Sequence, residues 1–286
     1  MLRLFNEISF RTSRLVTASY STSFSGAVRL LDHDIQDAIY SIYGFVRFAD
    51  EIVDTFHSFN KKDLLEKFEN DYYEALENGI SLNPVLNSFQ LTVKKYSIPD
   101  DLIRAFLDSM KTDLVKQNHN TKSETDDYIY GSAEVVGLMC LKVFVMGDES
   151  LFRELEMPAR KLGAAFQKVN FLRDIKDDTE YLNRKYFHIT IQNDFNEEAK
   201  NIIIDEIESD FAESLPGMMK LPGSSRLGVL IAYNYYNKLL KKIKKTPAGK
   251  LMNTRLRVSD LMKLFILLRT YLSFRLKLHG LKNYQN

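Results

Sequence analysis

The chain has 286 residues, of which 45% are hydrophobic and 27% are charged, and its formal net charge is +1. This length allows one or two hydrophobic cores, and a balance so close to neutral gives no overall field that would attract nucleic acid. The only cysteine, Cys140, excludes an intrachain disulfide and fits a reducing compartment. The N-terminus lacks the apolar core of a signal peptide, and no apolar run is long enough to span a bilayer. We therefore expect a cytoplasmic protein.

The first predicted helix covers residues 2–18, where apolar residues recur at roughly helical spacing. A polar cluster from Tyr20 to Ser25 follows and includes Ser21 and Ser23. Ser and Thr hydroxyls compete with the hydrogen bonds of a helix, so the cluster predicts a break or kink.

Residues 34–56 are predicted to form one long helix that is apolar on most sides and therefore buried. A narrow polar stripe runs along it at steps of four, three and four residues, and consists of Tyr43, Arg47, Asp50 and Asp54. Buried carboxylates are unstable unless they are paired or bind a metal. The stripe therefore predicts a bound cation.

Four further helices are predicted before the middle of the chain, at 61–77, 84–96, 99–116 and 121–146. The last of these contains Gly131, Ser132, Ala133 and Gly137, which leave one helix face without bulk. Such a face predicts either close helix packing or a smooth wall for a long apolar ligand.

A second polar stripe is predicted on a helix that starts at Pro158 and covers residues 158–181. Its members step by three, four and four residues and are Gln167, Asn170, Asp174 and Asp178. Arg173 lies beside them, and Arg184 follows in a predicted loop. We expect the two stripes to face each other across a cavity.

The remaining predicted helices cover residues 196–214, 222–245 and 259–280, with a break at Pro216-Gly217. The last one is both basic and apolar. Its pattern favours a core helix with a charged outer face over a helix that docks on a membrane. No stretch alternates convincingly with a period of two, so residues 1–286 are predicted to form one all-α domain.

The polar residues of the two stripes indicate the ligand. Carboxylate and amide oxygens without His or Cys suit Mg²⁺, and arginines supply forked donors for phosphate. The surrounding apolar residues suit a hydrocarbon. The sequence contains no phosphate-binding glycine loop of the nucleotide type. A diphosphate on a long isoprenoid tail meets all of these demands.

The pattern Asp50-x-x-x-Asp54, followed by Gln167-x-x-Asn170-x-x-Arg173-Asp174-x-x-x-Asp178, resembles the phytoene/squalene synthase family of head-to-head trans-prenyltransferases. The likeness covers nearly the whole chain and is greatest to bacterial phytoene synthases. It departs from the family at Glu134, where small residues are usual, and at Tyr20, where many members carry His.

The resemblance implies an isoprenoid synthase-type helical bundle around a central cavity. It also implies condensation of two prenyl diphosphates through a cyclopropylcarbinyl diphosphate to a symmetric hydrocarbon of carotenoid biosynthesis. The Mg²⁺ ligands it implies are Asp50, Asp54, Asn170, Asp174 and Asp178. The residues it implies for substrate binding are Tyr20, Ser21, Ser23, Tyr43, Arg47, Tyr128, Gln167, Arg173, Arg184, Tyr236 and Arg255.

Three functions are compatible with these residues, and the first of them is favoured. The first is a phytoene synthase that uses two geranylgeranyl diphosphates. The second is a dehydrosqualene or squalene synthase that uses two farnesyl diphosphates, with NADPH only in the squalene case. The third is a non-catalytic assembly factor with the same fold, which would be expected to lose the acidic residues that this chain keeps. Because the substrates and products are membrane-soluble, we also expect peripheral contact with the inner surface of a membrane.

Overall fold

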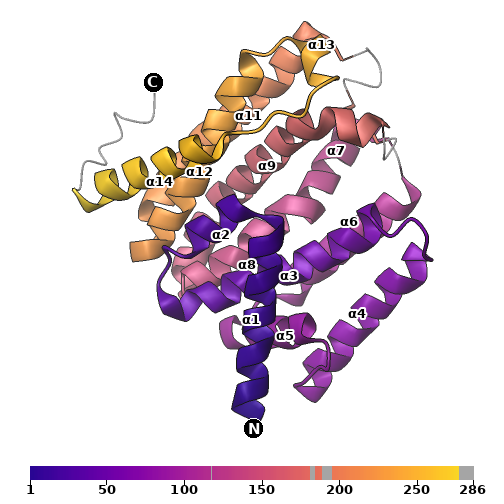
Figure 1. Ribbon diagram of the computed structural model, residues 1–286, viewed down its shortest axis with the longest axis vertical. Helices are drawn as coiled ribbons and strands as arrows, with labels where there is room; N and C mark the ends of the chain where they lie inside the picture. Colours follow the sequence, from indigo (N-terminus) through magenta and orange to yellow (C-terminus); the bar gives the residue numbers. More distant parts are fainter. Residues whose placement is uncertain (117, 181–183, 189–194, 277–286) are drawn as a thin grey trace.

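The computed structural model describes residues 1–116, 118–180, 184–188 and 195–276, and helices follow one another along these parts of the chain (Figure 1). The described residues contain no β-strand, only an isolated bridge between Asn118 and Lys185. The prediction of an all-α fold is confirmed. The helices are α1 (Leu2–Tyr20), α2 (Thr22–Val28), α3 (His33–Asp54), α4 (Lys61–Asn78), α5 (Pro84–Tyr96), α6 (Asp100–Val115), α7 (Lys122–Ile129), the π-helical turn η1 (Tyr130–Glu134), α8 (Val135–Phe144), α9 (Glu149–Glu180), α11 (Glu197–Lys220), α12 (Gly223–Lys244), α13 (Ala248–Leu251) and α14 (Asp260–Arg275).

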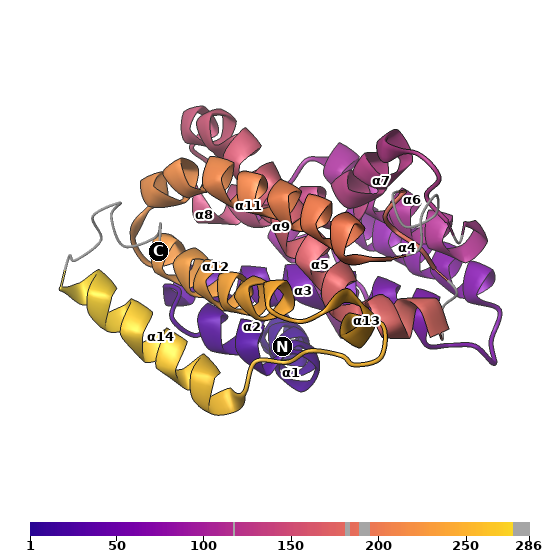
Figure 2. The ribbon, with the colours of Figure 1, turned by 90° about the horizontal axis from the view of Figure 1, so that it is seen from above.

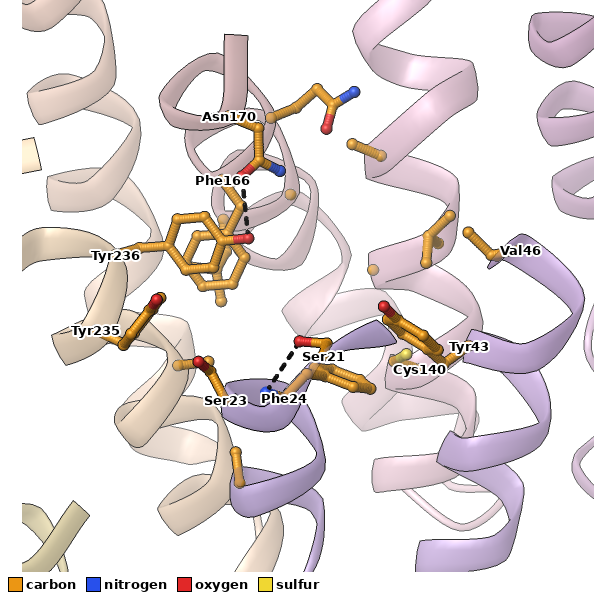
Figure 3. Close-up of a pocket in the computed structure, with 18 of the residues that line it drawn as sticks. Ser21, Ser23, Phe24, Tyr43, Val46, Cys140, Phe166, Asn170, Tyr235 and Tyr236 are labelled. Atoms are coloured by element: carbon orange, nitrogen blue, oxygen red, sulfur yellow. Dashed lines mark hydrogen bonds between the residues drawn. The ribbon is translucent and has the colours of Figure 1, made fainter. Parts of the chain in front are cut away.

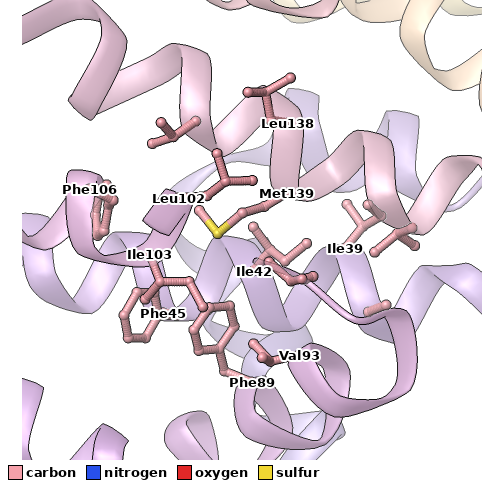
Figure 4. Close-up of a cluster of buried hydrophobic side chains, with 14 of the residues drawn as sticks. Ile39, Ile42, Phe45, Phe89, Val93, Leu102, Ile103, Phe106, Leu138 and Met139 are labelled. Atoms are coloured by element: carbon pink, nitrogen blue, oxygen red, sulfur yellow. The ribbon is translucent and has the colours of Figure 1, made fainter. Parts of the chain in front are cut away.

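Helix α3 is buried as predicted, because its apolar sides contact α1, α5, α6 and α8. Phe45 is fully buried at its middle and stacks on Phe89 of α5, with the ring centroids 4.0 Å apart (Figure 4). Aromatic stacks of this kind add stability beyond the area they bury. The long helix is thus fixed on several sides, and its polar stripe is held in a defined direction.

A second hydrophobic cluster joins α9, α11 and α12, which run beside one another (Figure 2). One buried ion pair accompanies it, between Lys168 Nζ of α9 and Asp210 Oδ2 of α11 at 2.9 Å. A paired buried charge is tolerated because each group satisfies the other. This cluster fixes α9 against α11 and α12.

Two predicted helix boundaries at prolines are wrong. Helix α9 begins at Glu149 and contains Pro158 in its interior, and α11 continues through Pro216 to Lys220. A proline inside a helix removes one hydrogen bond but does not end the helix when the flanking turns are packed. Here the packing is close, because a Cβ atom on Gly217 would lie 2.2 Å from Cβ of Pro158.

The predicted helix at 121–146 is interrupted by the π-helical turn η1, a feature that often accompanies functional sites. At this turn Gly131 lies against α6, where an added Cβ atom would be 2.8 Å from the Ala105 carbonyl oxygen and from Ser109 Cβ. Close helix packing, one of the two predicted uses of the small residues, therefore applies to Gly131.

Gly131→Ala is expected to lower the free energy of unfolding by about 1–3 kcal/mol, because the added methyl group overpacks this contact. Urea denaturation followed by circular dichroism measures the change. Gly249→Ala is the matched control, since nothing lies within 4 Å of its added Cβ atom. Equal stability of the two variants would contradict the assigned contact.

The C-terminal helix differs from its prediction. Its outer face is apolar rather than charged, with Leu261 83% exposed and Phe265 56% exposed. The prediction of a core helix with a charged outer face is therefore wrong. Helix α14 ends at Arg275, and the predicted end near Gly280 lies outside the described residues. Among the helices of the described ranges, none has the length and hydropathy needed to cross a bilayer.

Candidate active site

The polar stripe of α3 lines a cavity of about 1040 Å³. Tyr43, Arg47, Asp50 and Asp54 all contribute to its wall. The Arg47 guanidinium forms ion pairs with Asp50 and with Glu51, and it lies 4.3 Å from the centre of the ring of Tyr20. Tyr20, Ser21 and Ser23 line the same cavity. The spacing of four, three and four residues therefore places the stripe where the sequence predicted it.

The polar stripe of α9 lines the same cavity. Gln167, Asn170, Arg173, Asp174 and Asp178 are all in its wall. The Arg173 Nε donates to Asp174 Oδ1 at 2.9 Å. A second arginine, Arg255, approaches the same oxygen at 2.7 Å from the segment between α13 and α14. The two stripes thus face one cavity, as predicted, and both carry arginine–aspartate pairs.

Arg184 connects the two stripes. Its Nη1 lies 2.7 Å from Asp54 Oδ1 on α3, and its backbone N–H donates to the Asp178 carbonyl oxygen on α9 at 2.8 Å. Its Nη2 donates to the Asp113 carbonyl oxygen at 3.2 Å. Only 7% of the Arg184 side chain is exposed. Burial lowers the pKa of this guanidinium, but the facing Asp113, Tyr186 and Asp54 outweigh that effect and raise it, so Arg184 stays charged.

The acidic groups on the two helices repel one another. Burial, and then the neighbouring Asp54, raise the pKa of Asp50 to about 7, although Arg47 opposes the shift. Burial, and then Asp174 and Asp54, raise the pKa of Asp178 to about 8. Asp54 on α3 therefore acts on a carboxyl of α9, which means that negative charge is concentrated between the helices. A divalent cation placed there relieves this repulsion.

Two aromatic pairs flank the polar stripes (Figure 3). Tyr236 of α12 stacks on Phe166 with the ring centroids 4.0 Å apart, and its hydroxyl donates to Asn170 Oδ1 at 3.3 Å. On the opposite wall Tyr43 stacks on Phe24 at 4.9 Å. The predicted residues Tyr236 and Tyr43 are thus brought to one cavity, each with its ring against another ring.

Ser21 has a structural role as well as a place in the cavity wall, because its Oγ accepts a hydrogen bond from the Phe24 backbone N–H and begins α2 (Figure 3). The sequence predicted a break at this cluster, and α1 does end at Tyr20 before α2 begins at Thr22. The turn between the two helices places Ser21 and Ser23 at the cavity.

Tyr128 reaches the cavity from α7, and its hydroxyl donates to Asp113 Oδ2 at 2.7 Å. Its ring stacks on that of Tyr186 with the centroids 5.1 Å apart. Gln167 of α9 donates to Ser132 Oγ at 3.3 Å and so ties the acidic helix to η1. Both predicted polar residues are therefore engaged with neighbours that also line the cavity.

Asp113 and Tyr186 are two residues of the cavity wall that the sequence reasoning missed. Burial raises the pKa of Asp113 to about 7, while Arg184 opposes the shift. A signal was present, because Asp113 follows Phe106 and Met110 at steps of four and three on the apolar side of its helix. A carboxylate in a buried stripe again calls for a partner, which here is Arg184.

The small residues also form a wall, the second of their two predicted uses. Ser132, Ala133 and Gly137 line the cavity together with Cys140, whose thiol pKa burial raises to about 12, so the thiol stays protonated. Glu134, the residue of this segment at which the chain departs from the resembling family, does not line the cavity. Its carboxylate pairs with Arg160 at 2.6 Å and so adds no charge to this wall.

The carboxylate and amide oxygens of the two stripes suit Mg²⁺, but they do not form a site that holds the ion through protein ligands alone. Across the part of the chain that the structure describes, no three His, Cys, Asp or Glu residues are grouped so that they could hold a metal ion. Mg²⁺ is usually held by one or two carboxylates and by phosphate oxygens of a substrate. Burial and neighbouring carboxylates raise the pKa values of Asp50 on α3 and of Asp178 on α9, so negative charge at these two positions is not fully compensated. An open site completed by a phosphorylated ligand suits these residues.

The sequence model of the squalene/phytoene synthase family matches residues 17–261. The chain is similar to the phytoene synthase of Arthrospira platensis, with 29% identity over 181 residues, and it covers 58% of the length of that protein. It is also similar to the 4,4'-diapophytoene synthase of Staphylococcus haemolyticus, with 27% identity over 210 residues that make up 71% of this chain and 69% of that protein.

The fold is also that of solved structures. The chain superposes on the crystal structure of a dehydrosqualene synthase with a TM-score of 0.78, over 94% of this chain and 98% of the other, at 19% sequence identity. The helical arrangement around the cavity is therefore shared with that protein even though few residues are identical.

Proposed function

The chain belongs to the squalene/phytoene synthase family, and we propose that it is a Mg²⁺-dependent prenyltransferase that joins two molecules of geranylgeranyl diphosphate head to head to form phytoene. The observation that carries the proposal is the pair of acidic stripes, on α3 and α9, that line one cavity with otherwise mostly apolar walls. Diphosphates would bind at the stripes, and the prenyl tails would fill the apolar part.

The size of the cavity supports two long substrates. Ordinary small-molecule sites have volumes of about 300–1,000 Å³, and this cavity holds about 1040 Å³. Its apolar wall extends from Phe24 and Val28 to Leu221. Two prenyl chains side by side account for both the volume and the apolar lining.

Four arginines would bind and orient the diphosphates. Arg47 and Arg173 each lie beside an aspartate of their own helix, Arg184 bridges α3 and α9, and Arg255 pairs with Asp174. Guanidinium groups bind phosphate through paired N–H donors. Because all four already form ion pairs with carboxylates, they are held in place before a substrate arrives, which reduces the entropy lost on binding.

Mg²⁺ bound by Asp50, Asp54, Asn170, Asp174 and Asp178 would stabilise the negative charge that develops on a departing diphosphate. The arginines add to this effect by electrostatic stabilisation of the leaving group. Departure of the first diphosphate would leave an allylic cation. The double bond of the second substrate would attack this cation, and loss of one proton would close the three-membered ring of a cyclopropylcarbinyl diphosphate. Departure of the second diphosphate, rearrangement and loss of one proton give the symmetric hydrocarbon.

The aromatic pairs would protect the cationic steps. The stacked pairs Tyr43–Phe24 and Tyr236–Phe166 both line the cavity. Ring faces attract cations, and apolar walls exclude the water that would trap them as alcohols. The chain's own contribution is therefore to orient two tails, hold two diphosphates and keep the space between them dry.

Mg²⁺ together with inorganic pyrophosphate is expected to raise the melting temperature by about 5 °C at saturating concentrations, because a ligand at 100 times its Kd stabilises a protein by about 2.7 kcal/mol. Differential scanning fluorimetry measures the shift. Mg²⁺ alone should give a smaller one, since phosphate oxygens complete the site. A full shift with pyrophosphate and a metal chelator would contradict the proposed metal role.

Two alternatives remain distinct from the proposal. The likeness to a 4,4'-diapophytoene synthase supports farnesyl diphosphate as the substrate and dehydrosqualene or squalene as the product. A non-catalytic assembly factor is disfavoured because both acidic stripes are complete. Incubation of the purified chain with Mg²⁺ and either farnesyl or geranylgeranyl diphosphate, with and without NADPH, separates them by the mass of the hydrocarbon. The proposal predicts a C40 product that is independent of NADPH, and no hydrocarbon under any condition would overturn it.

The product of the proposed reaction has no polar group, so it must leave the cavity into a lipid phase. Peripheral contact with a membrane surface is therefore part of the proposal. This contact requires an apolar surface next to the opening of the cavity.

A further inference from the structure

Helix α14 carries an apolar face that the described part of the chain leaves exposed. Leu261, Phe265, Leu268 and Leu272 follow one another at steps of four, three and four residues, so they lie on one side of the helix. They are 83%, 56%, 49% and 56% exposed. A row of large apolar side chains on a surface marks a site of contact with a partner or a membrane.

The opposite side of α14 is fixed to the bundle, so the exposed face has a defined direction. Ile266 and Thr270 are buried, and Thr270 Oγ1 accepts a hydrogen bond from Asn234 of α12 at 2.9 Å. Leu267 packs against the small cluster that contains Ala27 of α2. Both views of the ribbon show α14 beside α12 at the edge of the molecule (Figures 1 and 2).

The charges of α14 complement an anionic surface. The helix has three basic residues, Lys263, Arg269 and Arg275, and one acidic residue, Asp260, which pairs with Lys263 at 2.9 Å. Arg269 directly follows Leu268 and is exposed at the edge of the apolar face. Helices that combine large apolar side chains with Lys and Arg lie in the interface of membranes that contain anionic lipids.

The wall of the cavity extends to helix α14. Leu264 and Leu267 of α14 line the cavity, and Leu264 is also 54% exposed. Gly26 and Ala27 of α2 line it from the other side, and a Cβ atom on Gly26 would lie 3.9 Å from Leu267 Cδ1. One helix therefore contributes both to the cavity wall and to the exposed apolar face.

We propose that the exposed face of α14 docks on the surface of a bilayer that contains anionic phospholipids, and that the cavity opens between α2 and α14 into the apolar layer of that bilayer. The docking itself is inferred from α14 alone. The release of a hydrocarbon through this opening rests on the proposed function.

Sedimentation of the full chain with lipid vesicles tests the docking without any substrate. The chain is expected to bind mixed vesicles made of phosphatidylcholine and phosphatidylglycerol in equal proportion. It should bind vesicles made of phosphatidylcholine alone more weakly. The double variant Leu268→Glu, Leu272→Glu should lose at least roughly tenfold in vesicle affinity, because two charges enter the apolar layer. Arg269→Gln should lose about fivefold on the anionic vesicles only.

Leu82→Glu is the matched control, because Leu82 is 92% exposed and lies between α4 and α5, away from α14. It should bind vesicles as the wild type does. The melting temperature of the double variant should equal that of the wild type, and so should its turnover in detergent micelles, because neither Leu268 nor Leu272 lines the cavity. On vesicles its turnover should fall.

Three results would overturn the docking: a wild-type chain that binds neither vesicle, a double variant that binds as well as the wild type, or a wild-type dimer that the double variant converts to monomers without any vesicle binding. The last result would make this face an interface between copies of the chain. Vesicle binding without hydrocarbon formation would instead overturn the proposed function and the release step, and would leave the docking intact.

Discussion

Asp50→Asn and Asp178→Asn are each expected to lower turnover by at least about 10²- to 10³-fold, the effect typical of removing one group that stabilises charge in the transition state. The two residues lie on different helices but line one cavity. Each replacement removes a carboxylate oxygen from the proposed metal site while keeping the volume of the side chain. Steady-state measurement of diphosphate release from geranylgeranyl diphosphate gives the loss.

The same two variants should fold normally. Burial and neighbouring carboxylates disfavour the ionised forms of Asp50 and Asp178, as their raised pKa values show. In metal-free buffer above pH 8, where both groups are forced to ionise, the melting temperature of each variant should equal or exceed that of the wild type. Asp71→Asn is the control for both measurements, because Asp71 forms a surface pair with Lys67 on α4. Full turnover in either active-site variant would contradict the assignment of these carboxylates.

Arg184→Gln is expected to lower the free energy of unfolding by about 3–5 kcal/mol, the usual cost of removing one partner from a buried ion pair. The change leaves Asp54 without its partner at 2.7 Å and removes the ion pair between Arg184 and the buried Asp113 at 3.9 Å. Turnover should fall as well, because the bridge between the two polar stripes is lost. Chemical denaturation at neutral pH measures the stability.

The loss should become smaller as the pH falls below 7. Burial raises the pKa of Asp113 to about 7 even with Arg184 present, so its protonation at lower pH removes the uncompensated charge in the variant. Adding Asp113→Asn to Arg184→Gln should likewise recover part of the stability. Arg14→Gln is the matched control, because Arg14 and Asp37 form an exposed pair at 2.9 Å whose loss should cost under about 1 kcal/mol. A pH-independent loss would contradict the role of the carboxylates.

The parts of the structure that follow from local spacing could be predicted from the sequence. The steps of three and four residues that define the polar stripes depend only on the pitch of a helix. That is why Asp50, Asp54, Asp174 and Asp178 could be assigned to two helix faces from their spacing alone. That the two faces meet at one cavity could also be expected, because one bound cation can compensate buried carboxylates from both helices.

The parts that depend on contacts between distant segments could not be predicted. Pro158 and Pro216 indicate helix ends, but α9 and α11 pass through them because the two helices pack closely at Gly217. The outer face of α14 is apolar, as the buried face of a core helix is, so its composition alone predicts burial. Phe265 is exposed because α14 lies at the edge of the bundle. Asp113 was missed because its partner, Arg184, is distant in sequence.

The number of diphosphates released for each molecule of hydrocarbon tests the central claim most directly. Head-to-head joining of two prenyl diphosphates in this cavity releases both diphosphates and leaves none on the product. With geranylgeranyl diphosphate and Mg²⁺, the chain should therefore release two diphosphates for each C40 hydrocarbon formed. Release of one diphosphate with a longer prenyl diphosphate as the product, or release with only a C20 alcohol, would contradict the account.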